Sequence, residues 1–317
     1  MTLAAQTPAP SVAAAELRHG ATSVRVAIGP GAPVTSFCVD GHEWCAAGAW
    51  MDYAPTAGAC ALPSYVAGAP RAPFPEGGLL AAEAPAVDVQ ADGAGGRITA
   101  SWAPTRYPLS WRRTISLDAD GGLCVRYETT NTQRARLPFV WGCRLSLPWS
   151  ASVVIDIPRG SRSRVAVAHG EGLSAAGTEF AWPAVRDGGR LADLSRPARL
   201  DARRAVQCYV DLPRGRFGVR DGDVALDISG DEGVVTHAHL WANNDADTPD
   251  AGPRRWWRPR MPIRALAVGP AVGAPGLLND AVGAWRAARW VDAGETLRWT
   301  VRFRPVTITS ATTSTST

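Results

Sequence analysis

The sequence contains no lysine, so all 33 of its basic residues are arginine. Enzymes that form a Schiff base need a lysine amine or the N-terminal amine, and the lysine route is therefore excluded. The net charge is only +4 over 317 residues. Because a dedicated nucleic-acid-binding protein normally carries a large and clustered positive charge, we do not expect a nucleic acid as the partner.

Metal and cofactor motifs are also missing. The six cysteines form no C-x-x-C pair and share no ligand spacing with histidine, which leaves a zinc site without support. Phosphate-loop, dinucleotide, nucleophile-elbow and H-E-x-x-H signatures do not occur. We therefore expect free thiols, no metal and no cofactor. Neither a secretory signal nor a membrane span is visible, so we expect a cytoplasmic protein that does not contact a membrane.

The ends of the chain differ from its middle in composition. Residues 1–17 are rich in Ala, Pro, Thr and Ser, and residues 307–317 form a Ser/Thr tract. Such segments bury too little apolar surface to fold, so both are predicted to be flexible tails around one domain at residues 18–306. Within that domain, only Leu277 to Trp290 has apolar residues at helical spacing.

The remaining sequence is a series of short alternating or apolar runs separated by Gly, Pro and Asp, such as SVRVAIG, VTSFCVDG, RITASW, SVVIDIP, AVQCYVDLP and LRWTVRFRP. This spacing is typical of antiparallel strands joined by tight turns. In RRTISLDADGGLCVRYETTN, two alternating runs flank the glycine-containing loop Asp118 to Gly122. We predict an all-β fold, either a large sandwich or a barrel.

Six segments resemble, in order, motifs of the galactose mutarotase-like superfamily, which includes the aldose 1-epimerases. They are VTSFCVDGHEW, RYPLSWRRTISL, TNTQRARLPFVWGCRLSL, HLWANN, ALAVGPAVGAPGLLNDAV and AGETLRWTVRFRP. The resemblance spans most of residues 20 to 305. It implies a β-supersandwich of mostly antiparallel strands, with a sugar site on the concave face of one sheet.

The two catalytic positions of that family are altered in this chain. Mutarotation needs a base for the anomeric hydroxyl proton and an acid for the ring oxygen. The family uses the histidine of a P-F-x-x-G-x-H stretch and the glutamate of a glutamate-proline segment. We assign these positions to Cys143 and Gly269. Cys143 could serve as an acid, base or nucleophile, or it could simply fill the core.

The segment VVTHAHLWANND offers substitute residues. A period of two places His237, His239, Trp241 and Asn243 on one face of a strand, and Ala238, Leu240 and Ala242 on the other. Imidazole and amide groups supply hydrogen bonds, and tryptophan supplies a flat apolar surface for a pyranose. The polar face is either a sugar site or an ordinary solvated face. Asp245 and Asp247 could supply a carboxylate, but their D-x-D-x-P context favours a turn.

Arginine and tryptophan alternate in the run PRRWWRPR, Pro253 to Arg260. Arginine binds carboxylate or phosphate and also stacks on tryptophan, so Arg255 and Arg258 are either anion-binding residues or part of a loop held by cation–π contacts. Arg106 lies on a strand near the family's sugar site. We expect Trp102, Trp141 and Trp149 to lie in the core.

The leading hypothesis is an aldose 1-epimerase-like isomerase with substituted catalytic residues. His239, His237 and Cys143 are its candidate catalytic residues, and its candidate binding residues are Arg106, Trp241, Asn243, Arg255 and Arg258. The expected partner is a sugar or sugar-like metabolite, including acidic or phosphorylated forms, and the chain is expected to be a monomer or homodimer. The alternatives are a non-catalytic carbohydrate-binding protein, an enzyme of another class such as a lyase or cyclase that reuses the concave site, and an anion- or nucleic-acid-binding module built on the arginine-tryptophan run.

Overall fold

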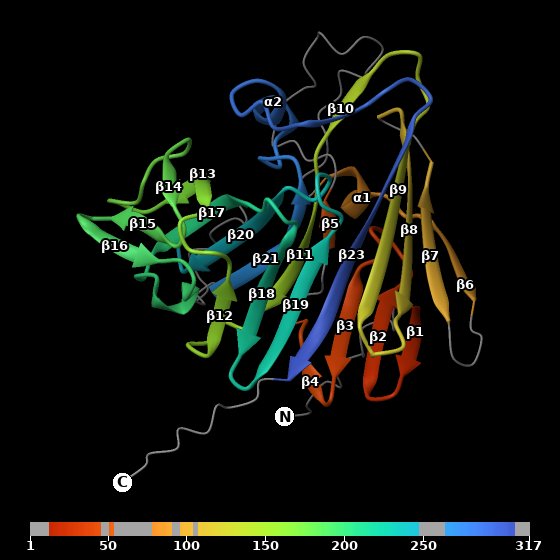
Figure 1. Ribbon diagram of the computed structural model, residues 1–317, viewed down its shortest axis with the longest axis horizontal. Coiled ribbons are helices and arrows are strands. Elements are labelled where there is room, and N and C mark those ends of the chain that lie inside the picture. The colour runs from red at the N-terminus through yellow and green to blue at the C-terminus, as the bar shows by residue number, and fades with distance from the viewer. Residues whose placement is uncertain are drawn as a thin grey trace, which may run out of the picture.

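The computed structural model describes residues 13–45, 78–90, 96–103, 107–246 and 264–307, together with the backbone of residues 51–53. Nearly all regular structure in these residues is antiparallel β-sheet (Figure 1), which confirms the predicted fold class. No helix in the described part of the chain is long and apolar enough to cross a membrane.

An eight-stranded sheet forms one layer, with strand order β12-β18-β19-β23-β9-β8-β7-β6. Its strands in chain order are β6 (Ala86–Gln90), β7 (Arg97–Trp102), β8 (Leu109–Leu117), β9 (Leu123–Asn131), β12 (Val153–Asp156), β18 (Arg216–Asp221), β19 (Val224–Gly230) and β23 (Thr296–Thr307). The predicted hairpin is confirmed: β8 pairs with β9, and Asp118 N donates to Gly122 O at 2.7 Å in the connecting turn.

A seven-stranded sheet forms the facing layer, with strand order β14-β13-β17-β20-β21-β11-β5. Its strands are β5 (Met51–Tyr53), β11 (Trp141–Leu147), β13 (Arg162–His169), β14 (Glu179–Ala181), β17 (Arg204–Asp211), β20 (His237–Asn244) and β21 (Arg264–Val272). In Figure 1, β13 to β17 lie at the left and β6 to β9 at the right.

Smaller elements complete the described structure. A four-stranded sheet contains β1 (Ala14–His19), β2 (Thr22–Ala27), β3 (Val34–Val39) and β4 (His42–Glu43). The two-stranded sheets pair β10 (Leu137–Phe139) with β22 (Arg289–Val291), and β15 (Ala184–Asp187) with β16 (Arg190–Asp193). The helices are short: α1 (Leu79–Ala82), α2 (Leu278–Val282) and the 3-10 turn η1 (Pro197–Arg199).

Aromatic side chains join the two large sheets. Trp299 of β23 stacks on Tyr127 of β9 with ring centroids 5.3 Å apart, and Trp141 of β11 meets Trp299 edge-on at 5.4 Å. All three side chains are buried. Since each such pair contributes about 0.5–1.5 kcal/mol beyond its area burial, this cluster fixes β11 against the eight-stranded sheet. The prediction that Trp141 and Trp102 lie in the core is confirmed.

The four-stranded sheet covers the part of the eight-stranded sheet's inner face that the seven-stranded sheet leaves open. Strand β1 contacts β7 and β8, and the buried Arg113 of β8 donates to the carbonyl oxygen of Ala32. Both large sheets therefore keep one outer face that points away from the core.

Two predicted boundaries differ from the structure. Strand β1 begins at Ala14, so the folded domain starts inside the segment assigned to the N-terminal tail; the alternating burial of Ala15 and Leu17 explains this pairing. The predicted helix at 277–290 is limited to α2, which ends at Val282 with Gly283 as its C-cap. The residues after Gly283 instead form a turn and then strand β22, in which Trp290 pairs with Pro138 of β10.

Candidate functional site on the outer face of the seven-stranded sheet

Strand β20 has the predicted alternation. Ala238, Leu240 and Ala242 belong to the core between the sheets. His239 and Trp241 lie on the outer face, where His239 is fully buried and Trp241 is half-buried. The polar face is thus covered at His239 and partly open at Trp241.

Neighbouring strands place three further groups around His239. Tyr209 of β17 lies directly opposite it on one side, with ring centroids 5.0 Å apart, and Gly269 of β21 lies opposite it on the other. The amide Nε2 of Gln207 donates to His239 Nε2 at 2.8 Å. An imidazole that accepts at Nε2 is the neutral tautomer with its proton on Nδ1. The backbone N–H of Gly276 donates to the Tyr209 hydroxyl at 2.8 Å.

Burial determines the protonation of both histidines. It holds the pKa of His239 well below the ordinary value of 6.5, and the positive charge of Arg144 lowers this pKa further. The pKa of His237 is also lowered by burial, against the opposing effect of Asp211, whose Oδ1 lies 3.4 Å from His237 Nε2. Both imidazoles are therefore neutral near pH 7, and His239 is too weakly basic to act as an efficient proton acceptor there.

Arg144, rather than Cys143, is the residue of β11 whose charge acts on His239. Cys143 is fully buried in the core cluster together with its alternate neighbours Trp141 and Leu145. Counted from Pro138, the P-F-x-x-G-x-H spacing ends at residue 144, so our assignment of the histidine position to Cys143 was one residue early. The side chain of Arg144 is on the opposite side of the strand and acts electrostatically on His239. By this count, the histidine position of the resembled motif is assigned to Arg144.

Gly269, at the glutamate position, has no room for a side chain. A Cβ atom built on it would lie 2.0 Å from the carbonyl oxygen of Cys143 and 3.3 Å from its sulfur. Strand β11 pairs with β21 at Gly142 and again at Leu145, and the two residues between these positions form no β-pair with β21. The backbone of β11 therefore occupies the volume that a glutamate stem would need.

The segment that follows β21 covers part of the outer face. The ring of Trp285 lies 5.9 Å from that of Tyr209, and the guanidinium carbon of Arg164 lies 4.4 Å from the Trp285 ring centroid. The Nε of Arg164 donates to the Gly177 carbonyl oxygen at 3.1 Å. Arg164 and Trp285 together thus close one side of the Tyr209 environment.

The remaining predicted residues do not join this group. The side-chain oxygen of Asn243 accepts from Ala246 N at 2.9 Å and closes a turn, in which Asp245 has a positive φ of 61°. This bond ties the side-chain oxygen of Asn243 to the turn after β20. Four other predicted residues lie outside the described residues, namely Arg106, Asp247, Arg255 and Arg258.

Sequence reasoning missed Gln207, Tyr209, Arg144 and Trp285. The segment AVQCYVD alternates polar Gln207, Tyr209 and Asp211 with apolar Val206, Cys208 and Val210, the same pattern that identified His237 to Asn243. That signal was available in the sequence. The pairing of Tyr209 with His239 was not, because antiparallel register between distant strands depends on the whole sheet.

These layers and their connections define the galactose mutarotase-like fold. Similar solved structures include the Slr1438 protein of Synechocystis, with a TM-score of 0.70 and 14% identity over 97% of this chain and 100% of that one. A galactose mutarotase-like protein from Lactobacillus casei gives 0.63 and 14% over 93% and 100%. A galactose mutarotase related enzyme from Lactobacillus acidophilus gives 0.59 and 12% over 94% and 99%. No protein-family model and no curated protein matches the sequence.

Proposed function

We propose that this protein binds a sugar or sugar-like metabolite on the outer face of the seven-stranded sheet and does not use the acid/base pair of the aldose 1-epimerases. The observation that carries the proposal is the pair of residues at the two catalytic positions. Arg144 is permanently protonated, and Gly269 offers neither an acid nor space for one. Neither can exchange a proton with a sugar.

The other side chains on this face suit sugar recognition. Trp241 supplies a half-buried aromatic surface, and Gln207, which lies opposite Trp241 on β17, supplies an amide. Rings and amides of this kind fix the apolar face and the hydroxyls of a pyranose. Tyr209 and the neutral His239 extend the polar row.

The charges on this face favour an acidic sugar. Arg144 and Arg164 both belong to it. Among the described outer-face residues of the sheet, Asp211 of β17 and Glu179 of β14 are acidic, and Glu179 is already paired with Arg162 at 2.6 Å. Asp211 faces His237. Because arginine binds a carboxylate or phosphate through charge-assisted hydrogen bonds, a hexuronate or a hexose phosphate fits this face better than a neutral hexose.

Isothermal titration with neutral hexoses, hexuronates and hexose phosphates tests the proposal. Trp241→Ala should weaken binding of every sugar by about tenfold, a loss of about 1.4 kcal/mol. Arg144→Gln should weaken only the acidic ones by a similar factor. Arg112→Gln, on the exposed outer face of the eight-stranded sheet, is the matched control. Absence of binding at millimolar sugar, or equal affinity in all variants, would contradict the proposal.

One observation favours isomerase activity as a second candidate. The Gly276 N–H donates to the Tyr209 hydroxyl oxygen, which is the contact that would stabilise a phenolate after proton transfer. Tyr209 could then act as the acid for the ring oxygen. Under this candidate, Tyr209→Phe abolishes anomer exchange but keeps sugar binding.

A further inference from the structure

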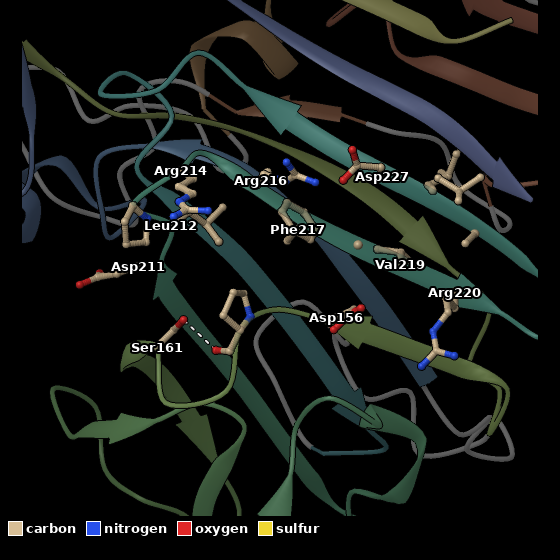
Figure 2. A pocket seen from close by; sticks show the side chains of 16 residues that line it. Asp156, Ser161, Asp211, Leu212, Arg214, Arg216, Phe217, Val219, Arg220 and Asp227 are labelled. Atoms are coloured by element: carbon tan, nitrogen blue, oxygen red, sulfur yellow. Dashed lines mark hydrogen bonds between the residues drawn. The ribbon is translucent and has the colours of Figure 1, made fainter. Parts of the chain in front are cut away.

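A groove lies on the other large sheet. This groove of about 850 Å³, which we term the Gly218 groove, crosses the outer face of β12, β18 and β19 and continues over the loop that follows β17 (Figure 2). The polar lining residues used below are Asp156, Asp211, Arg214, Arg216, Arg220 and Asp227. Its volume is in the range of small-molecule sites, roughly 300–1,000 Å³.

Glycine makes the floor of the groove. Gly218 lies directly opposite Asp156 of β12 on one side and Asp227 of β19 on the other. A Cβ at Gly218 would make only ordinary contacts, the nearest at 3.4 Å to the Asp156 Cβ. Gly218 therefore leaves the floor between the two aspartates without a side chain, and the backbones of these aspartates lie about 10 Å apart at two strand spacings.

Arginines lie at both ends of this row. Arg216 and Arg220 are two residues before and after Gly218 on the same face of β18, about 13 Å apart at the rise of a β-strand. Figure 2 shows Arg214 and Arg216 toward one end of the groove and Arg220 at the other, with Asp156 and Asp227 on opposite sides. All three arginines are exposed.

The charges in the groove do not neutralise one another. Among the residues that the structure describes, Arg214, Arg216 and Arg220 form no ion pair or side-chain hydrogen bond, and neither do Asp156 and Asp227. The nearby Asp211 faces His237 instead. The groove thus offers separated cations and anions to a ligand rather than to each other.

From this arrangement we propose that the Gly218 groove binds an acidic oligosaccharide. A pyranose ring over Gly218 would donate its hydroxyls to the Asp156 and Asp227 carboxylates, which are acceptors only. Carboxylates on neighbouring sugar units would reach the arginines at the two ends. A polyphosphate or nucleic acid lacks hydroxyl donors at this density and would leave both aspartate carboxylates without a donor, so these anions fit less well.

Isothermal titration with oligogalacturonates of one to four units tests this site, with maltotetraose as the neutral probe and a thymidine tetranucleotide as the phosphate probe. We expect the uronate tetramer to bind more tightly than the monomer and than both other tetramers. The double variant R216Q/R220Q should weaken it by about tenfold for each arginine. Gly218→Val should abolish binding by filling the floor, since valine suits an exposed strand position.

Two controls separate this site from the one on the seven-stranded sheet. Arg112→Gln, on the same outer face but outside the groove, should bind the uronate tetramer normally. In the Trp241→Ala background, which weakens the other site, R216Q/R220Q and Gly218→Val should still produce their full loss of tetramer binding. Circular dichroism melting verifies that each variant is folded. Failure of the uronate tetramer to bind at millimolar concentration, equal binding of the thymidine tetranucleotide, or unchanged affinity in folded Gly218→Val overturns the proposal, whatever the outcome at Trp241.

Discussion

Gly269 and His239 lie directly opposite each other on neighbouring strands, and the Cβ that Gly269 lacks would lie 2.0 Å from the carbonyl oxygen of Cys143. The loss of the glutamate is therefore built into the backbone of the sheet. A single substitution cannot restore it, because β11 would first have to move away from β21.

Gly269→Ala should be destabilising for that reason. Overpacking a close-packed sheet costs about 1–3 kcal/mol and more where backbone must shift, so the midpoint of urea denaturation should fall. Gly218→Ala is the matched control, since its Cβ would have only ordinary contacts. Equal midpoints for the two variants would show that the β11 backbone can shift at Cys143 at little cost in free energy.

Cys143→Ala should leave sugar binding within twofold of the unmodified protein, since Cys143 lies in the core. Its expected effect is a loss of stability of about 1 kcal/mol from the small cavity. The native thiol should also resist iodoacetamide until the protein unfolds. Rapid labelling of Cys143 in the native protein, or loss of sugar binding without loss of stability, would show that Cys143 belongs to the sugar site and not to the core.

Stability should fall as the pH drops from 7 to 5.5. The pKa values of His239 and His237 are lowered on folding. Below about pH 6.5 the unfolded chain therefore binds more protons than the folded one, and this protonation stabilises the unfolded state relative to the folded state. Each histidine contributes at most about 1.4 kcal/mol per pH unit in this window. Urea denaturation at both pH values should show the decrease, and His239→Gln should reduce it. A decrease that is the same in His239→Gln would contradict the placement of His239.

Tyr209→Phe should loosen the segment that follows β21. Removal of the hydroxyl leaves the Gly276 N–H without its acceptor, and an unsatisfied buried donor costs about 1–3 kcal/mol. Hydrogen exchange should therefore be faster at the Gly276 amide, while the amides of β9 exchange as before. Unchanged exchange at Gly276 would mean that this bond does not hold the segment.

Local patterns predicted the strands well because alternation reports which face is buried. His239 and Leu240 were placed on opposite faces from sequence alone, and the structure agrees. The contents of the site were less predictable. Tyr209 and Trp285 meet across 76 residues of chain, and a one-residue error in reading the motif exchanged Cys143 for Arg144. In a strand, such an error moves a residue from the site to the core.

Anomer exchange, measured by NMR on the sugar that binds most tightly, tests most directly whether this protein binds a sugar without isomerising it. With the protein at a concentration that saturates the sugar, we expect the α and β anomers to interconvert at the uncatalysed rate. We also expect Arg144→Gln to reduce binding without changing that rate. Interconversion accelerated by the unmodified protein and abolished by Tyr209→Phe would contradict a binding-only role and establish an isomerase.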